Sequence, residues 1–177
     1  MRRTPVPGAR VPNVCQRGFS VVVLTTRAEE TEGFGARLAR SRPPADALSV
    51  IYLSGDLGAG KTTLTRGFLR ELGVIGAVRS PTYTLAEIYT LGSLTALHLD
   101  LYRLSDAAEL DNLGVREWAR SGHLWLIEWP ERGADRLPGA DLVITLTAGE
   151  AGHDIDVVSA SPLGADWLRR LELSPNS

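Results

Sequence analysis

The chain has 177 residues, of which 44% are hydrophobic and 23% charged, and its formal net charge is −2. This composition is that of a globular protein, which excludes an intrinsically disordered chain, and the length suits one domain with a sizeable core. The charge argues against autonomous nucleic-acid binding. Cys15, the single cysteine, excludes an internal disulfide and a cysteine-based zinc site. No apolar run approaches the ~20 residues of a membrane span, so we expect a cytoplasmic protein without membrane contact.

The basic residues are distributed unevenly, both by type and along the chain. Eighteen of the nineteen are arginine and one, Lys61, is lysine. A lone lysine in such a chain is a candidate for a position where a guanidinium group cannot substitute. Residues 1–42 carry eight Arg and three Glu, a net charge of +5, which leaves −7 for residues 43–177.

The first eighteen residues differ in composition from the rest, with four Arg, three Pro and no acid. Such a tail could contact RNA or an acidic partner. A Pro-rich polar tract does not bury a core, which favours a disordered extension or a start codon placed too early. The segment also lacks the continuous apolar region of a signal peptide. We therefore predict a disordered basic extension over 1–18, one domain over 19–173 and a tail over 174–177.

The first half of the domain predicts alternating strands and helices. Residues 20–24 are β-branched and apolar, which indicates a strand, and a helix over 28–41 follows and ends before two prolines. Residues 47–53 form a short apolar run typical of a buried strand. A Gly-rich turn over 55–60 then leads into a helix over 61–72, which Gly73 terminates.

Strands dominate the second half. Residues 106–120 predict one or two short helices broken at Gly114, and residues 163–171 predict a closing helix. Apolar or alternating segments predict strands over 82–89, 94–101, 124–129, 142–147 and 155–160, the last two near a sheet edge. The predicted fold class is therefore α/β: a single domain with a mostly parallel sheet, flanking helices and antiparallel edge strands.

The Gly-rich turn carries the strongest motif in the chain, since residues 55–62 fit the pattern G-x-x-x-x-G-K-[ST] of a phosphate-binding loop, or P-loop. Its context is that of a P-loop, because an apolar strand precedes it and a helix follows. The glycines let successive backbone N–H groups turn inward as an anion-binding nest, and the helix N-terminus adds its dipole. The predicted cofactor-binding residues are Gly55, Asp56, Leu57, Gly58, Ala59, Gly60, Lys61, Thr62 and Thr63.

Two side chains of the loop have predicted roles. Lys61 reaches the β- and γ-phosphates as a compact point charge, and the hydroxyl of Thr62 coordinates Mg²⁺. The absence of a second lysine excludes the Asn-Lys-x-Asp motif with which GTPases generally read guanine, and no ABC-type signature is present. The predicted cofactors are therefore ATP and Mg²⁺.

A P-loop site needs an acid near the magnesium, and two acids follow apolar strands. Glu128 comes after Leu-Trp-Leu-Ile, and Asp100 ends His-Leu-Asp. A carboxylate is costly to bury unless it is paired or metal-bound. Glu128 could hold Mg²⁺ through water, orient the attacking water or serve as an ordinary capping carboxylate. Asp100 could act in the site or pair with Arg103, and His98 suits a hydrogen-bonded structural histidine better than a catalyst.

The segment Ser-Pro-Thr-Tyr-Thr-Leu at 80–85 follows the predicted P-loop helix. In P-loop proteins this connection often carries a switch that responds to the γ-phosphate. Its chemistry alone equally suits a turn that enters a strand.

Several motifs then occur together in one order: GDLGAGKTT (55–63), SPTYTL (80–85), HLDLYRL (98–104), GVREW (114–118) and IEWPE (127–131). In this combination the chain resembles the TsaE family, also called YjeE, over roughly residues 20–158. The resemblance implies an ATPase that binds a TsaB–TsaD heterodimer and resets it while TsaD threonylcarbamoylates an adenosine beside the anticodon of ANN-decoding tRNAs. It also implies that Lys61 and Thr62 hold phosphate and Mg²⁺, that Glu128 is the metal-associated acid, and that Asp100 takes part in nucleotide handling. It further implies that residues 80–85 form a switch-like segment, of which Thr82 is the residue that we place in the catalytic set, with Glu128 and Asp100.

Two features depart from the family pattern. The basic residues 1–18 have no counterpart in it, and near Gly152, where the family often shows arginine, this chain has His153 and Asp154. We therefore assign no nucleotide contact to that late segment and expect the adenine contacts from residues around 25–31. The net charge of −7 on residues 43–177 predicts that the protein contacts tRNA indirectly, through partner proteins.

Two other functions remain open at this point. A small-molecule P-loop kinase would share the loop, and Arg132 and Arg136 could supply its lid, but the chain after Glu128 is short and carries no acceptor motif. A nucleotide-gated scaffold would bind ATP without productive turnover, which Glu128 at its strand end argues against.

Overall fold

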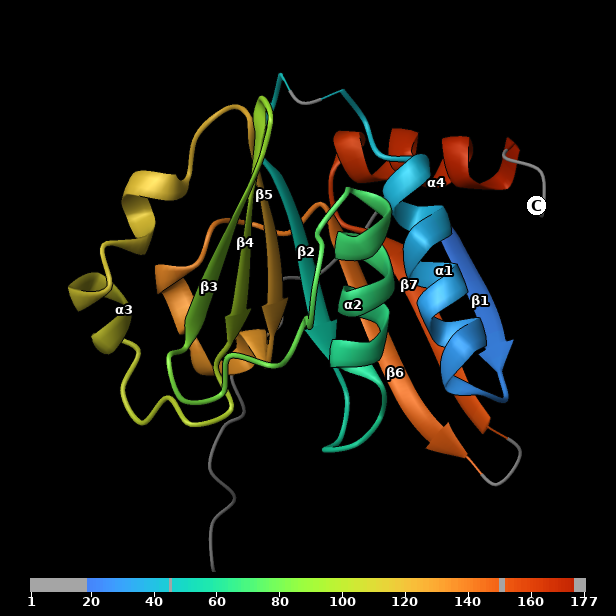
Figure 1. Cartoon of the computed structure of the whole chain (residues 1–177), viewed down its shortest axis with the longest axis horizontal. Helices are drawn as coiled ribbons and strands as arrows, with labels where there is room; N and C mark the ends of the chain where they lie inside the picture. The colour runs from blue at the N-terminus through green and yellow to red at the C-terminus, as the bar shows by residue number, and fades with distance from the viewer. Residues whose placement is uncertain (1–18, 45, 150–151, 174–177) are drawn as a thin grey trace, which may run out of the picture.

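The computed structural model describes residues 19–44, 46–149 and 152–173, which form one α/β domain around a seven-stranded sheet (Figure 1). The strand order is β1-β7-β6-β2-β5-β4-β3. The four central strands, β6, β2, β5 and β4, run parallel, whereas β7 and β1 on one side and β3 on the other pair antiparallel. The predicted fold class is confirmed. The strands are β1 (Ser20–Thr25), β2 (Ser49–Ser54), β3 (Ala86–Leu91), β4 (Leu94–Asp100), β5 (His123–Glu128), β6 (Leu142–Gly149) and β7 (Gly152–Ser159).

Strand β5 shows why the central strands appear in the sequence as unbroken runs of apolar residues. Alternate side chains of a strand point to opposite faces of the sheet. Leu124 and Leu126 belong to the larger core, and Trp125 and Ile127 belong to a second, smaller core on the other face. Because all four side chains are fully buried, the strand between His123 and Glu128 is apolar on both faces.

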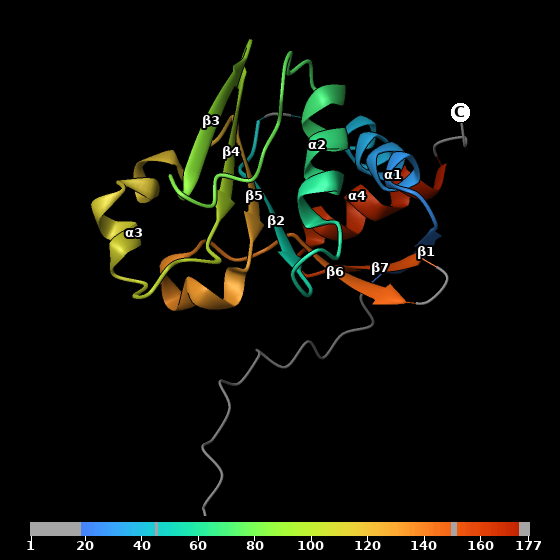
Figure 2. The same cartoon turned by 60° about the horizontal axis from the view of Figure 1, so that its bottom comes forward.

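Helices cover both faces of the sheet (Figure 2). The larger core lies under α1 (Ala28–Arg40), α2 (Lys61–Glu71) and α4 (Pro162–Leu173). The smaller core includes Leu110 from α3 (Glu109–Asn112) and Val115 from the 3₁₀ helix η1 (Val115–Trp118). Two further 3₁₀ helices, η2 (Pro130–Arg132) and η3 (Ala134–Arg136), follow β5.

Helices α1 and α2 pack backbone against backbone. A Cβ atom at Gly67 of α2 would lie 2.0 Å from the carbonyl oxygen of Glu32, and one at Gly35 of α1 would lie 2.2 Å from that of Leu64. Only glycine allows such an approach. The helix that begins at the phosphate loop is thereby held at a fixed, short distance from α1.

Most predicted elements are found with their ends shifted by one or two residues, but two strand starts are wrong. The strand expected over 155–160 begins three residues earlier, at Gly152. The strand expected over 82–89 begins only at Ala86, because residues 82–85 form a turn. In this turn the N–H of Leu85 donates to the carbonyl of Pro81 (2.7 Å), and Leu85 has a φ of 62°. The predicted break at Gly114, between α3 and η1, is confirmed by its φ of 63°. The short helices η2 and η3 were not expected.

Some expectations fall outside the described residues: the basic extension over 1–18 with Cys15, and the tail over 174–177. Within the described part of the chain, none of the helices has the length and apolar character needed to cross a membrane.

Candidate functional site

The Gly-rich turn between β2 and α2 folds as a tight loop against the neighbouring strand β6. A Cβ atom at Gly55 would lie 2.1 Å from the carbonyl oxygen of Leu146, so a side chain there would displace the loop. Gly60, the residue before α2, has a φ of 98°, which favours glycine. The loop therefore joins β2 to α2 in a tight turn, and it ends directly at the N-terminus of α2.

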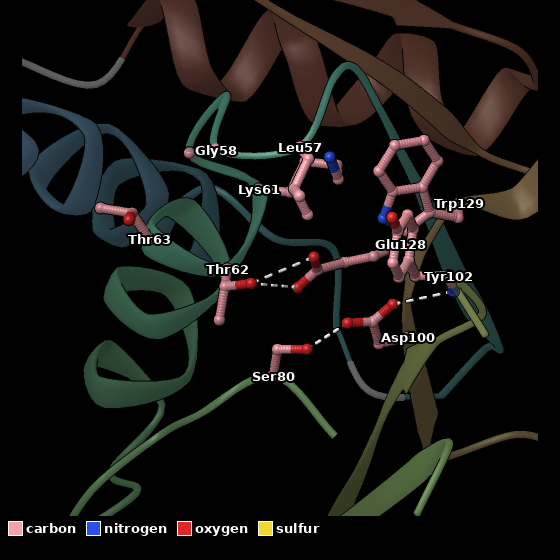
Figure 3. A pocket seen from close by; sticks show the side chains of 11 residues that line it. Leu57, Gly58, Lys61, Thr62, Thr63, Ser80, Asp100, Tyr102, Glu128 and Trp129 are labelled. Atoms are coloured by element: carbon pink, nitrogen blue, oxygen red, sulfur yellow. Dashed lines mark hydrogen bonds between the residues drawn. The ribbon is translucent and has the colours of Figure 1, made fainter. Parts of the chain in front are cut away.

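Lys61 lies at the centre of this loop. Its Nζ donates to the carbonyl oxygens of Gly55 (2.6 Å) and Asp56 (2.8 Å), and it lies 4.1 Å from the ring centroid of Trp129 (Figure 3). Burial lowers the pKa of Lys61, while the carboxylates of Glu128 and Asp100 act in the opposite direction. The ammonium group of Lys61 therefore lies between the loop carbonyls and the indole ring of Trp129. This space suits a compact ammonium group and would suit a planar guanidinium group poorly.

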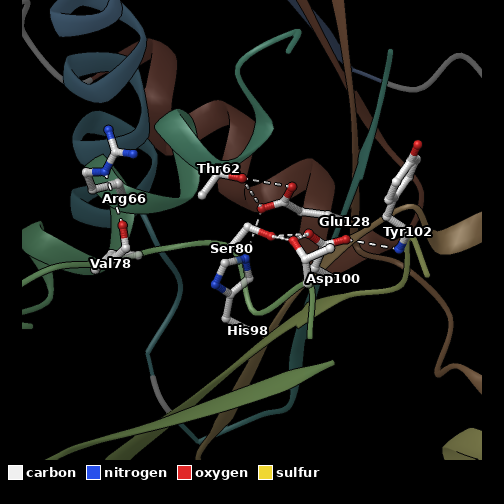
Figure 4. Close-up of polar contacts among 9 residues, drawn as sticks. Thr62, Arg66, Val78, Ser80, His98, Asp100, Tyr102 and Glu128 are labelled. Atoms are coloured by element: carbon white, nitrogen blue, oxygen red, sulfur yellow. Dashed lines mark hydrogen bonds and ion pairs between the residues drawn. The ribbon is translucent and has the colours of Figure 1, made fainter. Parts of the chain in front are cut away.

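Glu128, the last residue of β5, faces the beginning of α2. Its side chain is buried, with 2% of the residue exposed. The hydroxyl of Thr62 is 2.9 Å and 3.1 Å from its two carboxylate oxygens. On the other side, Nε2 of the buried His98 lies 2.9 Å from Oε1 of Glu128, and since a carboxylate only accepts, Nε2 donates (Figure 4). Two donors from separate elements therefore fix the orientation of this carboxylate.

Asp100 ends the neighbouring parallel strand β4, in register with Glu128. Its Oδ1 accepts from the N–H of Tyr102 (3.0 Å), and its Oδ2 accepts from Thr82 (2.9 Å) and from the hydroxyl of Ser80. The alternative pairing with Arg103 is not found in the described structure, where Arg103 lies over the ring of Tyr83 at 4.3 Å. Asp100 therefore anchors the turn over 80–85 to the sheet.

These groups surround one hollow of about 210 Å³ (Figure 3). The loop and the start of α2 form one wall, and the ends of β4 and β5 form the other. The lining residues are Leu57, Gly58, Gly60, Lys61, Thr62, Thr63, Ser80, Asp100, Tyr102, Glu128 and Trp129. The hollow thus combines an anion-binding helix N-terminus and a lysine with two fixed carboxylates, an arrangement suited to a phosphate group and a divalent cation.

Comparison with known proteins decides the family. A profile described as "Threonylcarbamoyl adenosine biosynthesis protein TsaE" matches residues 25–155. The chain belongs to the TsaE family.

Relatives and a solved structure agree with this assignment. The tRNA threonylcarbamoyladenosine biosynthesis protein TsaE of Haemophilus influenzae is 44% identical over 119 residues, covering 67% of this chain and 75% of that protein. The protein of the same name from Bacillus subtilis is 36% identical over 140 residues, covering 79% and 84%. A crystal structure of Bacillus subtilis YdiB superposes with a TM-score of 0.72 at 28% identity, covering 89% of this chain and 97% of that one.

The residues predicted for the TsaE-type site fall into three groups. Leu57, Gly58, Gly60, Lys61, Thr62, Thr63, Asp100 and Glu128 line the hollow. Gly55 and Asp56 contribute their carbonyl oxygens to Lys61. Ala59 is buried with its carbonyl turned towards His153, and Thr82 reaches Asp100 without lining the hollow.

The residues present fit a magnesium ion. Thr62 and Glu128 supply the hydroxyl and carboxylate oxygens that Mg²⁺ prefers. Among the described residues there is no group of three or more His, Cys, Asp or Glu side chains that could hold a metal ion by itself. This agrees with the usual mode of Mg²⁺ binding, in which one or two protein ligands act together with substrate phosphates and water.

A second hollow, of about 220 Å³, lies on the other side of the phosphate loop. Gly58, Gly60 and Thr63 line both hollows. The remaining walls come from Thr26, Arg27, Ala28 and Thr31, within or beside the stretch expected to contact adenine, and from His153. The loop thus lies between two hollows. Asp100 and Glu128 line the first, and no described carboxylate lines the second.

His98, expected as a hydrogen-bonded structural histidine, is hydrogen-bonded, and its partner is Glu128. Sequence reasoning missed that partner and two residues that shape the site. Tyr102, packed on Trp129 with ring centroids 5.1 Å apart, had no local signal. His153 was left out, yet its Nδ1 lies 2.7 Å from the carbonyl oxygen of Ala59. Only the pairing of β7 with β1 and β6 brings it there.

Proposed function

We propose that this chain is a Mg²⁺-dependent P-loop ATPase that acts in the cytoplasm, in tRNA threonylcarbamoyladenosine formation. It binds a TsaB–TsaD heterodimer and resets it, through ATP binding and hydrolysis, between rounds of threonylcarbamoyl transfer to the adenosine beside the anticodon. The names of its TsaE relatives support the pathway. The observation that carries the ATPase chemistry is the bond from Thr62, beside the P-loop lysine, to the buried carboxylate of Glu128.

Binding of the triphosphate would begin at the loop. Its backbone N–H groups and the N-terminus of α2 receive the phosphates, and Lys61 exchanges its bonds to the carbonyls of Gly55 and Asp56 for bonds to phosphate oxygens. Because Trp129 covers the ammonium group on one side, the indole ring must move or become a wall of the filled site.

The catalytic step would depend on Glu128. Thr62 would help to hold Mg²⁺, which would supply charge neutralisation for the departing ADP. Glu128, released from the Thr62 hydroxyl but still held by His98, would hold Mg²⁺ through water or accept a hydrogen bond from the attacking water. Asp100 keeps the turn over 80–85 against the site through Ser80 and Thr82, so that a change in the phosphates could be passed to this turn.

A kinase is less well supported. The two arginines that could form its lid are engaged elsewhere in the described structure. Arg132 lies over the ring of Tyr102, 5.4 Å from its centroid, and Arg136 pairs with Asp111. Neither lines the hollow. Since no arginine lines the hollow among the described residues, hydrolysis fits the site better than transfer to a second substrate.

Reconstitution tests the proposal. The protein is added to TsaB and TsaD homologues from the same organism, with tRNA and the threonylcarbamoyl donor, and modified tRNA is followed over several turnovers together with phosphate release. We expect sustained product only when the protein and ATP are both present. Equal product with and without the protein would contradict the proposed role, and phosphate found on a metabolite in place of free phosphate would favour the kinase.

A further inference from the structure

His153 of β7 reaches across to the phosphate loop and borders the second hollow. Its position is set by the backbone, because a Cβ atom at the preceding Gly152 would lie 2.2 Å from the carbonyl oxygen of Thr25. The strand therefore starts in direct contact with β1, and the imidazole of His153 extends over the loop. There Nδ1 lies 2.7 Å from the carbonyl oxygen of Ala59.

The contact between Nδ1 and the carbonyl oxygen of Ala59 determines which ring nitrogen of His153 carries the hydrogen. A carbonyl oxygen only accepts a hydrogen bond, so Nδ1 must carry the hydrogen. In the neutral ring Nε2 is then a lone-pair acceptor. Among the described residues no hydrogen bond to Nε2 is found. Nε2 is also not one of the fully buried polar atoms without a hydrogen-bond partner. The imidazole therefore offers a fixed acceptor to whatever fills the hollow.

The other side chains that border the second hollow do not have this character. The hydroxyls of Thr26, Thr31 and Thr63 can both donate and accept, so they suit either kind of partner. Arg27 only donates, and its guanidinium group is bound to Glu30 at 2.9 Å. Among the side chains of the described lining, Nε2 of His153 is thus the atom that accepts without donating.

We infer that His153 selects adenine over 6-oxopurines by accepting a hydrogen bond from the 6-amino group through Nε2. The inference rests on the proposed function, in which the phosphates occupy the loop. The base would then lie in the second hollow, which shares Gly58, Gly60 and Thr63 with the first and is bordered by residues of the stretch 25–31. Adenine carries an amino donor at the position where guanine and hypoxanthine carry a carbonyl acceptor. An oxygen facing Nε2 would leave two acceptors opposed and unpaired, at a cost of about ten- to one-hundredfold in affinity.

The test compares ATP with ITP, which differs in carrying a 6-oxo group. Binding of both to the full chain with Mg²⁺ is measured by calorimetry. The wild-type protein should bind ATP about ten- to one-hundredfold more tightly than ITP. In His153→Asn the shorter amide can still donate to the carbonyl of Ala59 but has no group at the place of Nε2, so the ratio should fall to about one. Asp154→Asn, the same new residue one position along and exposed, should keep the wild-type ratio.

The outcomes separate the inference from the proposed function. Equal binding of ATP and ITP by the wild-type protein, or an unchanged ratio in His153→Asn, would overturn the role of His153 while leaving the ATPase proposal intact. A chain that binds neither triphosphate would overturn both.

Discussion

The phosphate loop and the cluster of carboxylates at the strand ends face each other across one hollow, but they are built in different ways. The contacts of Lys61 within the loop span five and six residues. In the cluster, Thr62 and Glu128 are 66 residues apart, and His98 and Glu128 are 30 residues apart. The loop is thus a local structure, whereas the cluster exists only when β4 and β5 lie side by side.

This difference suggests a division of labour. The loop and the start of α2 offer backbone donors and one cation, groups that would bind phosphate without precisely placed partners from distant parts of the chain. The cluster offers two carboxylates, whose orientation depends on donors from other elements. We therefore expect changes in the loop to remove nucleotide binding, and changes in the cluster to spare binding but slow turnover.

The largest effect is expected from Glu128→Gln. The amide keeps the size of the side chain and can still accept from Thr62 and His98, but it no longer offers a negative charge to the attacking water. Turnover in the presence of the partner proteins should fall by about 10³-fold, within the usual range for loss of a general base, while calorimetry should show nearly unchanged ATP affinity. Normal hydrolysis by this variant would remove Glu128 from the catalytic set.

Lys61→Ala should produce the opposite pattern. Loss of a charge-assisted contact to the phosphates should weaken ATP binding by about 10²-fold, measured by calorimetry with Mg²⁺. Lys61→Arg is the informative control because it keeps the charge. The space between the loop carbonyls and Trp129 suits a compact ammonium group, so the arginine variant should also bind poorly. Full binding by Lys61→Arg would show that charge alone is required.

The same contrast explains what could be read from the sequence. The P-loop was predicted residue by residue, because a contiguous pattern of glycines, lysine and threonine dictates its own geometry. Glu128 and Asp100 were singled out because an acid after a buried strand is itself unusual, and both line the hollow. The turn over 82–85, closed by a local bond from Leu85 to Pro81, was one of two open alternatives. The bond from Thr62 to Glu128 and the contact of His153 with Ala59 could not be predicted, because each depends on which elements lie next to each other.

The close packing of α1 on α2, the helix that begins at the phosphate loop, should contribute to the stability of the domain. Gly67→Ala places a Cβ atom 2.0 Å from the carbonyl oxygen of Glu32, which is backbone and cannot rotate away. We expect a loss of about 2 kcal/mol in the free energy of unfolding, measured by urea denaturation. Gly33→Ala in α1 is the matched control, since its Cβ would meet nothing within 4 Å. It should stabilise the protein by about 0.5–1 kcal/mol.

The smallest effect is expected at the periphery of the cluster. Thr82→Val keeps the shape of the side chain but removes the hydroxyl that donates to Oδ2 of Asp100 at 2.9 Å. Asp100 retains its bonds from Ser80 and from the N–H of Tyr102, so the turn over 80–85 should loosen without detaching. We expect turnover to fall by about tenfold, since the loss is that of one hydrogen bond to a charged group, with ATP affinity unchanged.

Thr84→Val provides the comparison for this variant, because it makes the same substitution two residues further along the turn, at an exposed position. It should leave turnover at the wild-type rate. If both variants were equally slow, the effect would come from the turn in general and not from its bond to Asp100. If Thr82→Val weakened ATP binding as strongly as it slowed turnover, the turn would belong with the loop, and the division between a binding wall and a catalytic wall would have to be drawn elsewhere.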